Sequence, residues 1–195
     1  MTLRRAVCSL ALLLSMVTVS TRTSLAECEY SQALRTHLTR IRGMLMAIVA
    51  AMPEDKYDFR PTQGVRSFRE MVEHLISDSY THAGYVMGKT RAESEKIAGE
   101  KTKGIETRGQ YLKAMGEAFD FADKMLAGIT DENAMGTVTA MRGGKVTRIE
   151  AALQLFEDDM DHYGNFVVYL RLNGIVPPDT VENLKRLKSE GAHNH

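Results

Sequence analysis

The sequence contains no tryptophan, and only two cysteines and four prolines occur among its 195 residues. Cys8 lies in a segment that we expect to be removed, so only Cys28 remains and no internal disulfide can form. No stretch after residue 26 is long and uncharged enough to cross a bilayer, which argues against stable membrane insertion. Removal of the segment that contains Cys8 takes away three arginines and lowers the formal charge from zero to 22 − 25 = −3, which argues against a nucleic-acid partner. The hydrophobic core must therefore stabilise the fold without covalent links.

Several well-known catalytic patterns are also absent. We find no Ser-His-Asp or Cys-His arrangement and no GxSxG nucleophile motif. Gly143-Gly144 lacks the strand-to-helix context of a phosphate-binding loop, so it is interpreted as a turn. Any chemistry must therefore come from another kind of site.

The first 26 residues have the features of a secretory signal peptide. Arg4 and Arg5 form a basic start, an apolar run covers residues 6–19, and the small residues Ser24 and Ala26 precede the expected cleavage point. We therefore expect an exported protein, periplasmic or secreted. Its single domain would cover residues 27–189, followed by a flexible tail at residues 190–195.

Apolar residues recur every three or four positions over most of the remaining chain, which predicts helices over residues 30–52, 67–86, 107–128 and 147–173. Capping-box sequences begin at Ser67, Thr107 and Thr147. The predicted buried stripe of the last long helix consists of Ile149, Leu153, Phe156, Met160, Tyr163, Val167 and Leu170. Residues 135–146 would form a small hairpin, and a short helix would begin near Asp179. The second and third connections are expected to be long. The predicted fold class is all-α, a four-helix bundle with a short C-terminal helix.

Asp158 and His162 are separated by four residues in the last long helix. Side chains at this spacing lie one above the other, so a carboxylate and an imidazole can hold one metal ion. His74 could join them across the bundle as the third ligand. Such a set of two histidines and one carboxylate suits Zn²⁺ or non-haem Fe²⁺.

Two segments, AMPEDKYDFRPTQGVRSFREMVEHL and HYGNFVVYLRLNGIVPP, resemble the DinB family of metal-dependent four-helix-bundle proteins. The resemblance covers essentially the whole chain after residue 26. It implies three metal ligands, which are one histidine from the second helix and two, four residues apart, from the last. His74 and His162 match the first and third, and Asp158 occupies the place of the second.

Two other side chains near these positions remain open as participants. His82 lies about two turns beyond His74 and is a candidate to line a pocket. Asp159 is three residues from His162 and points closer to the core than Asp158, so it is the alternative carboxylate.

Relatives of known activity transfer or isomerise using low-molecular-weight thiols such as bacillithiol, mycothiol or glutathione, so the resemblance implies chemistry of that kind. The ligand types suit a divalent ion, Zn, Ni, Mn or Fe, which would bind a thiolate or activate water. We therefore expect a thiol-transfer or hydrolytic reaction on a small molecule. A second hypothesis, suggested by Asp158 in place of a histidine, is a degenerate bundle that binds a small ligand without catalysis. Under a third, the protein acts through its apolar helices as a homodimer, which the sequence leaves open.

Overall fold

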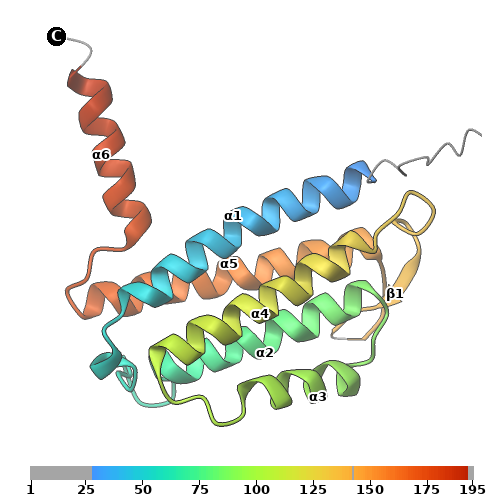
Figure 1. Ribbon diagram of the computed structural model, residues 1–195, viewed down its shortest axis with the longest axis horizontal. Helices are drawn as coiled ribbons and strands as arrows, with labels where there is room; N and C mark the ends of the chain where they lie inside the picture. Colours follow the sequence, from blue (N-terminus) through green and yellow to red (C-terminus); the bar gives the residue numbers. More distant parts are fainter. Residues whose placement is uncertain (1–27, 142, 193–195) are drawn as a thin grey trace, which may run out of the picture.

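The computed structural model describes residues 28–141 and 143–192, and long helices dominate it (Figure 1). The predicted signal peptide, Arg142 and residues 193–195 lie outside the described residues. The four long helices are α1 (Glu29–Ala51), α2 (Phe68–Val86), α4 (Arg108–Ala127) and α5 (Arg148–Leu172). Their bounds differ from the predicted ones by one residue or less at most ends. The all-α fold class is confirmed.

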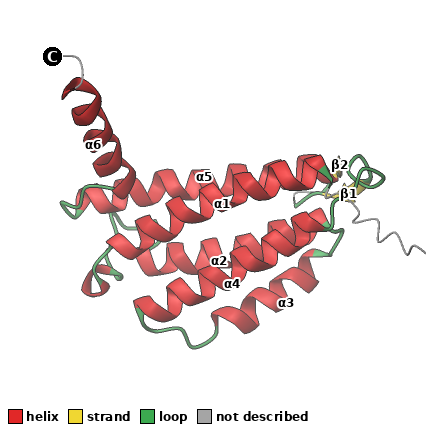
Figure 2. Cartoon of the chain, turned by 45° about the horizontal axis from the view of Figure 1, so that its top comes forward, coloured by secondary structure: helices red, strands yellow, loops and turns green. Residues whose placement is uncertain are grey.

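These helices lie side by side (Figure 2), and their packing contacts close a ring around one core. Helix α2 packs against α4 and α5, and α1 packs against the same two helices on the other side. The core is filled by side chains that are less than 2% exposed, among them Ile41, Leu45, Ile48, Phe68, Leu75, Tyr111, Phe119, Leu155 and Phe166. Within the described part of the chain, no helix is long and apolar enough to cross a membrane.

Capping boxes begin α2, α4 and α5, as the sequence predicts. At α2, the Ser67 hydroxyl accepts a hydrogen bond from the backbone N–H of Glu70, whose carboxylate in turn accepts one from the N–H of Ser67. This exchange satisfies two backbone donors that a helix start leaves unpaired. The starts of these helices are therefore specified locally.

The second connection, between α2 and α4, is long as expected, but it holds a helix that the sequence analysis does not predict. It contains helix α3 (Arg91–Thr102), which begins at another capping box, Thr90 with Glu93, and packs on the outside of α2. Only Ser94 and Ala98 of this helix are buried. A helix with so small a buried face has little apolar periodicity, so the pattern used to find the others did not reveal it.

The third connection carries the predicted hairpin. Strands β1 (Thr137–Thr139) and β2 (Lys145–Thr147) pair antiparallel, with Val138 opposite Val146. Gly143 and Gly144 have φ values of 80° and 84°, which glycine adopts without strain, and this explains the Gly-Gly turn. The hairpin packs on α2 and α5 near the start of α5.

The buried face of α5 differs from the predicted one. Leu153, placed in the main stripe, is 47% exposed, whereas Leu155, Asp159, His162 and Phe166 are buried. Two apolar strips run along this helix, and periodicity alone could not decide which of them faces α2. The structure turns the candidate site residues further inward than expected.

The C-terminal helix α6 (Pro178–Ala192) projects away from the bundle (Figure 1). The Tyr163 hydroxyl of α5 donates a hydrogen bond of 2.9 Å to Asp179 at the beginning of α6. At the same end of the bundle, a short 3₁₀ helix, Glu54–Lys56, follows α1 (Figure 1). Residues 190–192, predicted to belong to the tail, are part of α6.

Candidate metal centre

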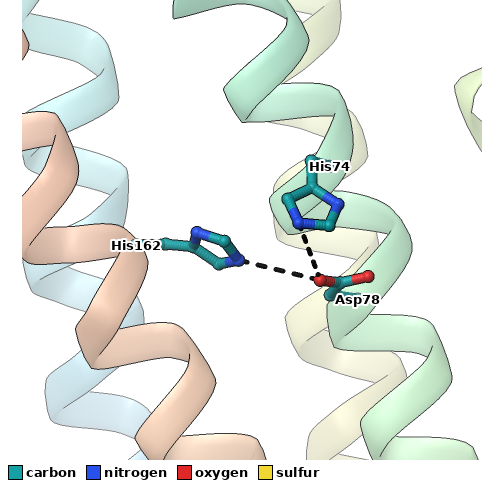
Figure 3. Close-up of side chains that lie close together, drawn as sticks. All are labelled: His74, Asp78 and His162. Atoms are coloured by element: carbon teal, nitrogen blue, oxygen red, sulfur yellow. Dashed lines mark ion pairs between the residues drawn. The ribbon is translucent and has the colours of Figure 1, made fainter. Parts of the chain in front are cut away.

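Three potential metal ligands meet where α2 faces α5 (Figure 3). His74 and Asp78 are four residues apart on α2, so they lie on the same face of that helix. His162 reaches toward them from α5, and its ring centroid lies 4.9 Å from that of His74. One ligand atom from each of the three lies within 4.8 Å of the other two.

The spacing of these atoms is suited to a bound ion. Asp78 Oδ2 lies 3.2 Å from His74 Nε2 and 3.7 Å from His162 Nε2. Two ligands at about 2.1 Å from one ion, in tetrahedral arrangement, would be about 3.4 Å apart. The distances from Asp78 to the two histidines are therefore close to those that one divalent ion could bridge.

Neither ring nitrogen of His162 has a hydrogen-bond partner among the described residues, although the residue is 95% buried. Its contacts with Asp78 and Asp158, at 3.7 and 3.4 Å, are longer than ordinary hydrogen bonds. Buried polar atoms are rarely left in this state, and functional sites are where exceptions occur. The cluster thus lacks a partner that an ion would supply.

The pKa values of the three histidines in this region are shifted in opposite directions. Burial alone would lower the pKa of His162, but the carboxylates of Asp158 and Asp78 together raise it to about 9. Burial lowers the pKa of His74 and of His82. The carboxylates thus favour a positive charge at this point of the interface, whether it is a proton on His162 or a cation.

Asp158 lies beside the cluster and between two histidines. Its Oδ2 is 3.4 Å from His162 Nε2, and its Oδ1 is 3.7 Å from Nε2 of His82. Burial would raise its pKa, but His162, His82 and His74 together lower it. Asp158 therefore remains ionised and contributes negative charge to the site.

Asp159 is fully buried and neither of its carboxylate oxygens has a hydrogen-bond partner within the described residues. Burial, followed by the charge of Asp158, raises the pKa of its carboxyl group to about 8. Asp159 is therefore protonated at neutral pH. In this state it is a poorer metal ligand than Asp78 or Asp158.

A cavity of about 630 Å³ adjoins the cluster on the side of Asp158. Helix α5 contributes one wall and the hairpin contributes another, while His82 of α2 also lines it. The prediction that His82 lines a pocket is confirmed. The cavity has the volume of a small-molecule site, and Asp158 lies between it and His162.

The model of the DinB superfamily matches residues 37–165, well over half of the chain and both helices that carry the cluster. The chain belongs to the DinB superfamily. The predicted family is confirmed, and a His/Asp cluster that could hold a metal ion lies in the helix pair where the resemblance placed one. No curated protein matches this DinB chain.

Three solved structures share the fold. A DinB-like protein from Bacillus subtilis is 19% identical, with a TM-score of 0.59, over 73% of this chain and 92% of its own. A DinB-family protein from Exiguobacterium sibiricum is 18% identical, with a TM-score of 0.58, over 75% and 93%. A DinB-like protein from Bacillus cereus is 11% identical, with a TM-score of 0.63, over 76% and 97%. At these identities the likeness establishes the fold.

The structure brings together two of the three predicted ligands, His74 and His162, and places Asp158 against His162. The carboxylate that completes the three-residue cluster is Asp78. The assignment of Asp158 as a direct ligand stays a prediction. Sequence reasoning missed Asp78, although His74 and Asp78 have the same four-residue spacing as Asp158 and His162.

Proposed function

We propose that this DinB protein binds one divalent metal ion and uses it for a thiol-transfer or hydrolytic reaction on a small molecule. The observation that carries the proposal is the cluster of His74, Asp78 and His162, in which the buried ring nitrogens of His162 have no hydrogen-bond partner among the described residues. Buried polar groups of this kind cost stability unless a ligand satisfies them. Their retention therefore points to a functional requirement.

The donor set fits a divalent ion. Two imidazoles and a carboxylate suit Zn²⁺, Ni²⁺, Mn²⁺ or Fe²⁺, so the choice among these metals stays open. Asp78 would neutralise part of the ion's charge, and Asp158 is near enough to His162 to act as a fourth ligand or to orient its ring. A divalent ion supplies Lewis acidity, which lowers the pKa of a water molecule or thiol beside it.

The surrounding residues would provide the conditions for that chemistry. His162 and Asp78 are almost fully buried, while the side chain of His74 is 28% exposed and opens the cluster toward solvent. The cavity beside Asp158 gives a small molecule access to the same point. Burial on one side and an opening on the other are typical of catalytic rather than purely structural metal sites.

The decisive experiment is metal content by elemental mass spectrometry. It uses the chain with His193→Gln and His195→Gln, which removes adventitious ligands. We expect near-stoichiometric metal that is lost in His74→Ala and in His162→Ala. His37→Ala, an exposed histidine on α1, is the matched control and should retain the metal.

Two further variants decide which carboxylate is the ligand. Asp78→Asn should abolish metal binding if Asp78 completes the cluster, whereas Asp158→Asn should weaken it about 10- to 100-fold if Asp158 only orients His162. The reverse order would restore the ligand set predicted from the sequence. Absence of metal in the parent chain, after incubation with all four metals, would refute the proposed function.

The alternative is a bundle that binds a small ligand without catalysis. The presence of Asp158 in place of a family histidine favours it. On this alternative, the metal-loaded protein would show no turnover with thiol or ester substrates, and His162→Ala would leave ligand affinity unchanged. Turnover that depends on His162 would exclude it.

We also propose export to the periplasm or beyond, supported by the basic start, apolar run and small residues in the first 26 positions. Expression of the full chain in a bacterial host should give a protein whose N-terminus, read by mass spectrometry, is Glu27. An intact N-terminus in the cytoplasmic fraction would contradict this proposal.

A further inference from the structure

A second cavity lies between α3 and α4, above the side of α2 that faces away from α5. Helix α3 packs closely on α2, whereas within the described chain its backbone does not approach α4 as closely. The cavity has a volume of about 340 Å³, which is within the range of small-molecule sites. It is lined by Tyr80 of α2, by Ile97 and Lys101 of α3, and by Glu117, Asp120 and Phe121 of α4.

This cavity is separate from the candidate metal centre. Tyr80 follows Asp78 by two residues on α2, so their side chains project about 200° apart around the helix. Asp78 faces His162 of α5, whereas the ring of Tyr80 packs against Phe121 of α4, with centroids 5.1 Å apart. The described residues that line the cavity include no member of the His/Asp cluster. A ligand here would therefore occupy a second site, on the opposite face of α2.

The hydroxyl of Tyr80 points to such a ligand. Tyr80 is only 2% exposed and lines the cavity. Its hydroxyl forms no hydrogen bond within the described part of the chain, yet protein atoms do not enclose it completely. A buried tyrosine hydroxyl normally has a hydrogen-bond partner, because burial without one costs stability. Burial also raises the pKa of Tyr80, so the hydroxyl keeps its proton at neutral pH and can donate it to an acceptor in the cavity.

The charged side chains of the cavity make one ammonium group accessible to an anion. Asp120 Oδ1 already lies 2.6 Å from Nη1 of Arg42 on α1. Glu117 lies 2.8 Å from the Lys101 ammonium and 4.0 Å from that of Lys113. Glu117 can therefore pair with Lys113 instead, which frees Lys101 for a ligand. The smaller cavity that adjoins this one is lined by three lysines, Lys101, Lys103 and Lys113.

We propose that the cavity between α2, α3 and α4 binds a small aromatic monocarboxylic acid in its ionised form. The carboxylate would accept hydrogen bonds from the Tyr80 hydroxyl and the Lys101 ammonium, and such charge-assisted bonds are the stronger kind. The ring of the acid would pack on Ile97 and Phe121, since aromatic rings favour tilted and edge contacts like that between Tyr80 and Phe121. The site needs no metal, so this inference does not rest on the proposed function.

The test is isothermal titration calorimetry of the metal-free full chain with three probes. Phenylacetate has the ring and the charge, 2-phenylacetamide has nearly the same shape without the charge, and acetate has the charge without the ring. We expect phenylacetate to bind, 2-phenylacetamide to bind at least about fivefold more weakly, and acetate to give no measurable binding. Raising the salt concentration should weaken the binding of phenylacetate.

Variants with matched controls then locate the site. Tyr80→Phe removes the hydroxyl alone and should lower the affinity for phenylacetate about tenfold. Tyr85→Phe changes a buried tyrosine of the same helix that does not line the cavity, so it should have no effect. Lys101→Gln should lower the affinity about two- to fivefold, whereas Lys96→Gln, at an exposed lysine of α3 outside the lining, should not. Circular dichroism checks that each variant keeps its helices.

Three results would overturn the inference. These are no binding of phenylacetate, equal affinity for phenylacetate and 2-phenylacetamide, and an affinity that is unchanged in both Tyr80→Phe and Lys101→Gln. His162→Ala separates this site from the metal centre, because we expect it to bind phenylacetate as the parent chain does. Loss of binding in that variant would place the acid at the His/Asp cluster and would also overturn the inference. Metal content is measured separately, so either proposal can fail without the other.

Discussion

The two ends of the interface between α2 and α5 are built from opposite kinds of side chain. Near the start of α2, Phe68 packs against Phe166 and Tyr169 of α5, with ring centroids 5.1 and 6.2 Å apart. The Tyr169 hydroxyl there donates a hydrogen bond to the Arg66 carbonyl. One to three turns further along, the same helices present histidines and aspartates.

The polar end also differs from the aromatic end because several of its buried groups have no hydrogen-bond partner among the described residues. Within the part of the chain that the structure describes, Ser79, His82, Asp159 and His162 carry buried atoms without hydrogen-bond partners, whereas the aromatic rings at the other end are buried against one another. Buried polar groups in this state lower stability, and packed aromatic side chains raise it. The comparison teaches that the aromatic end holds the helices together firmly enough for the polar end to keep its unpaired groups.

Removal of the aromatic contact between α2 and α5 should have the largest effect on stability. Phe68→Ala should lower the free energy of unfolding by about 3–5 kcal/mol, because a fully buried ring leaves a cavity. Urea unfolding followed by circular dichroism measures the change. Leu153→Ala, on the exposed side of α5, should alter stability by less than about 0.5 kcal/mol. A loss below 1 kcal/mol for Phe68→Ala would show that the aromatic end does not stabilise the interface.

The polar end should respond to pH through Asp159, whose pKa is raised from 3.8 to about 8. The folded protein holds a proton that the unfolded chain releases near pH 4. The free energy of unfolding of the metal-free protein should therefore fall between about pH 4 and pH 8, by about 1 kcal/mol per pH unit from this group. Asp159→Asn, which mimics the protonated acid, should remove that part of the slope. An unchanged slope in this variant would exclude a raised pKa.

A bound metal ion should offset the stability that the buried polar groups cost at this end of the interface. Zinc at a hundredfold excess over its dissociation constant should stabilise the fold by about 2.7 kcal/mol, because it binds the folded state alone. The pKa of about 9 at His162 means that a proton must leave before the metal binds, so metal affinity should rise with pH up to about 9. Thermal unfolding in buffers of increasing pH measures both effects. His162→Ala should abolish them, and a zinc effect retained in that variant would locate the ion elsewhere.

Removal of the N-cap of α2 should have the smallest effect on stability, and it tests whether the helix start influences the candidate metal centre. Ser67→Ala removes the side-chain cap of α2 and should cost about 1 kcal/mol. It should leave metal content unchanged, because the cap lies at the aromatic end. Thr107→Ala, which removes the equivalent cap of α4, is the matched comparison. Loss of metal in Ser67→Ala alone would show that the two ends of the interface are coupled.

Much of the fold could be predicted because its signals are local. Capping boxes at Ser67, Thr107 and Thr147 fixed where three helices begin, and the apolar stripe of α2 identified its buried face. Helix α3 escaped detection because its packing buries only Ser94 and Ala98, although Thr90 and Glu93 carried a capping signal of the same kind.

The site could be predicted only in part. The meeting of His74 and His162 followed from the resemblance to DinB proteins, since these residues are distant in sequence. The role of Asp78 and the nearly complete burial of His162 depend on how α2 and α5 turn about their axes when they pack. Two apolar strips on α5 allowed either rotation, and only the packed structure decides between them.

The hairpin and α5 share one residue, Thr147, which is both the last residue of β2 and the N-cap of the helix. No flexible spacer therefore separates the strand from the helix that carries Glu157, Asp158 and Asp161. Because Gly143 lines the cavity, we expect a change in the length of this turn to alter the cavity while leaving α2, α5 and the His/Asp cluster in place. The turn thus offers protein engineers a way to change which molecules are admitted without rebuilding the centre that would act on them.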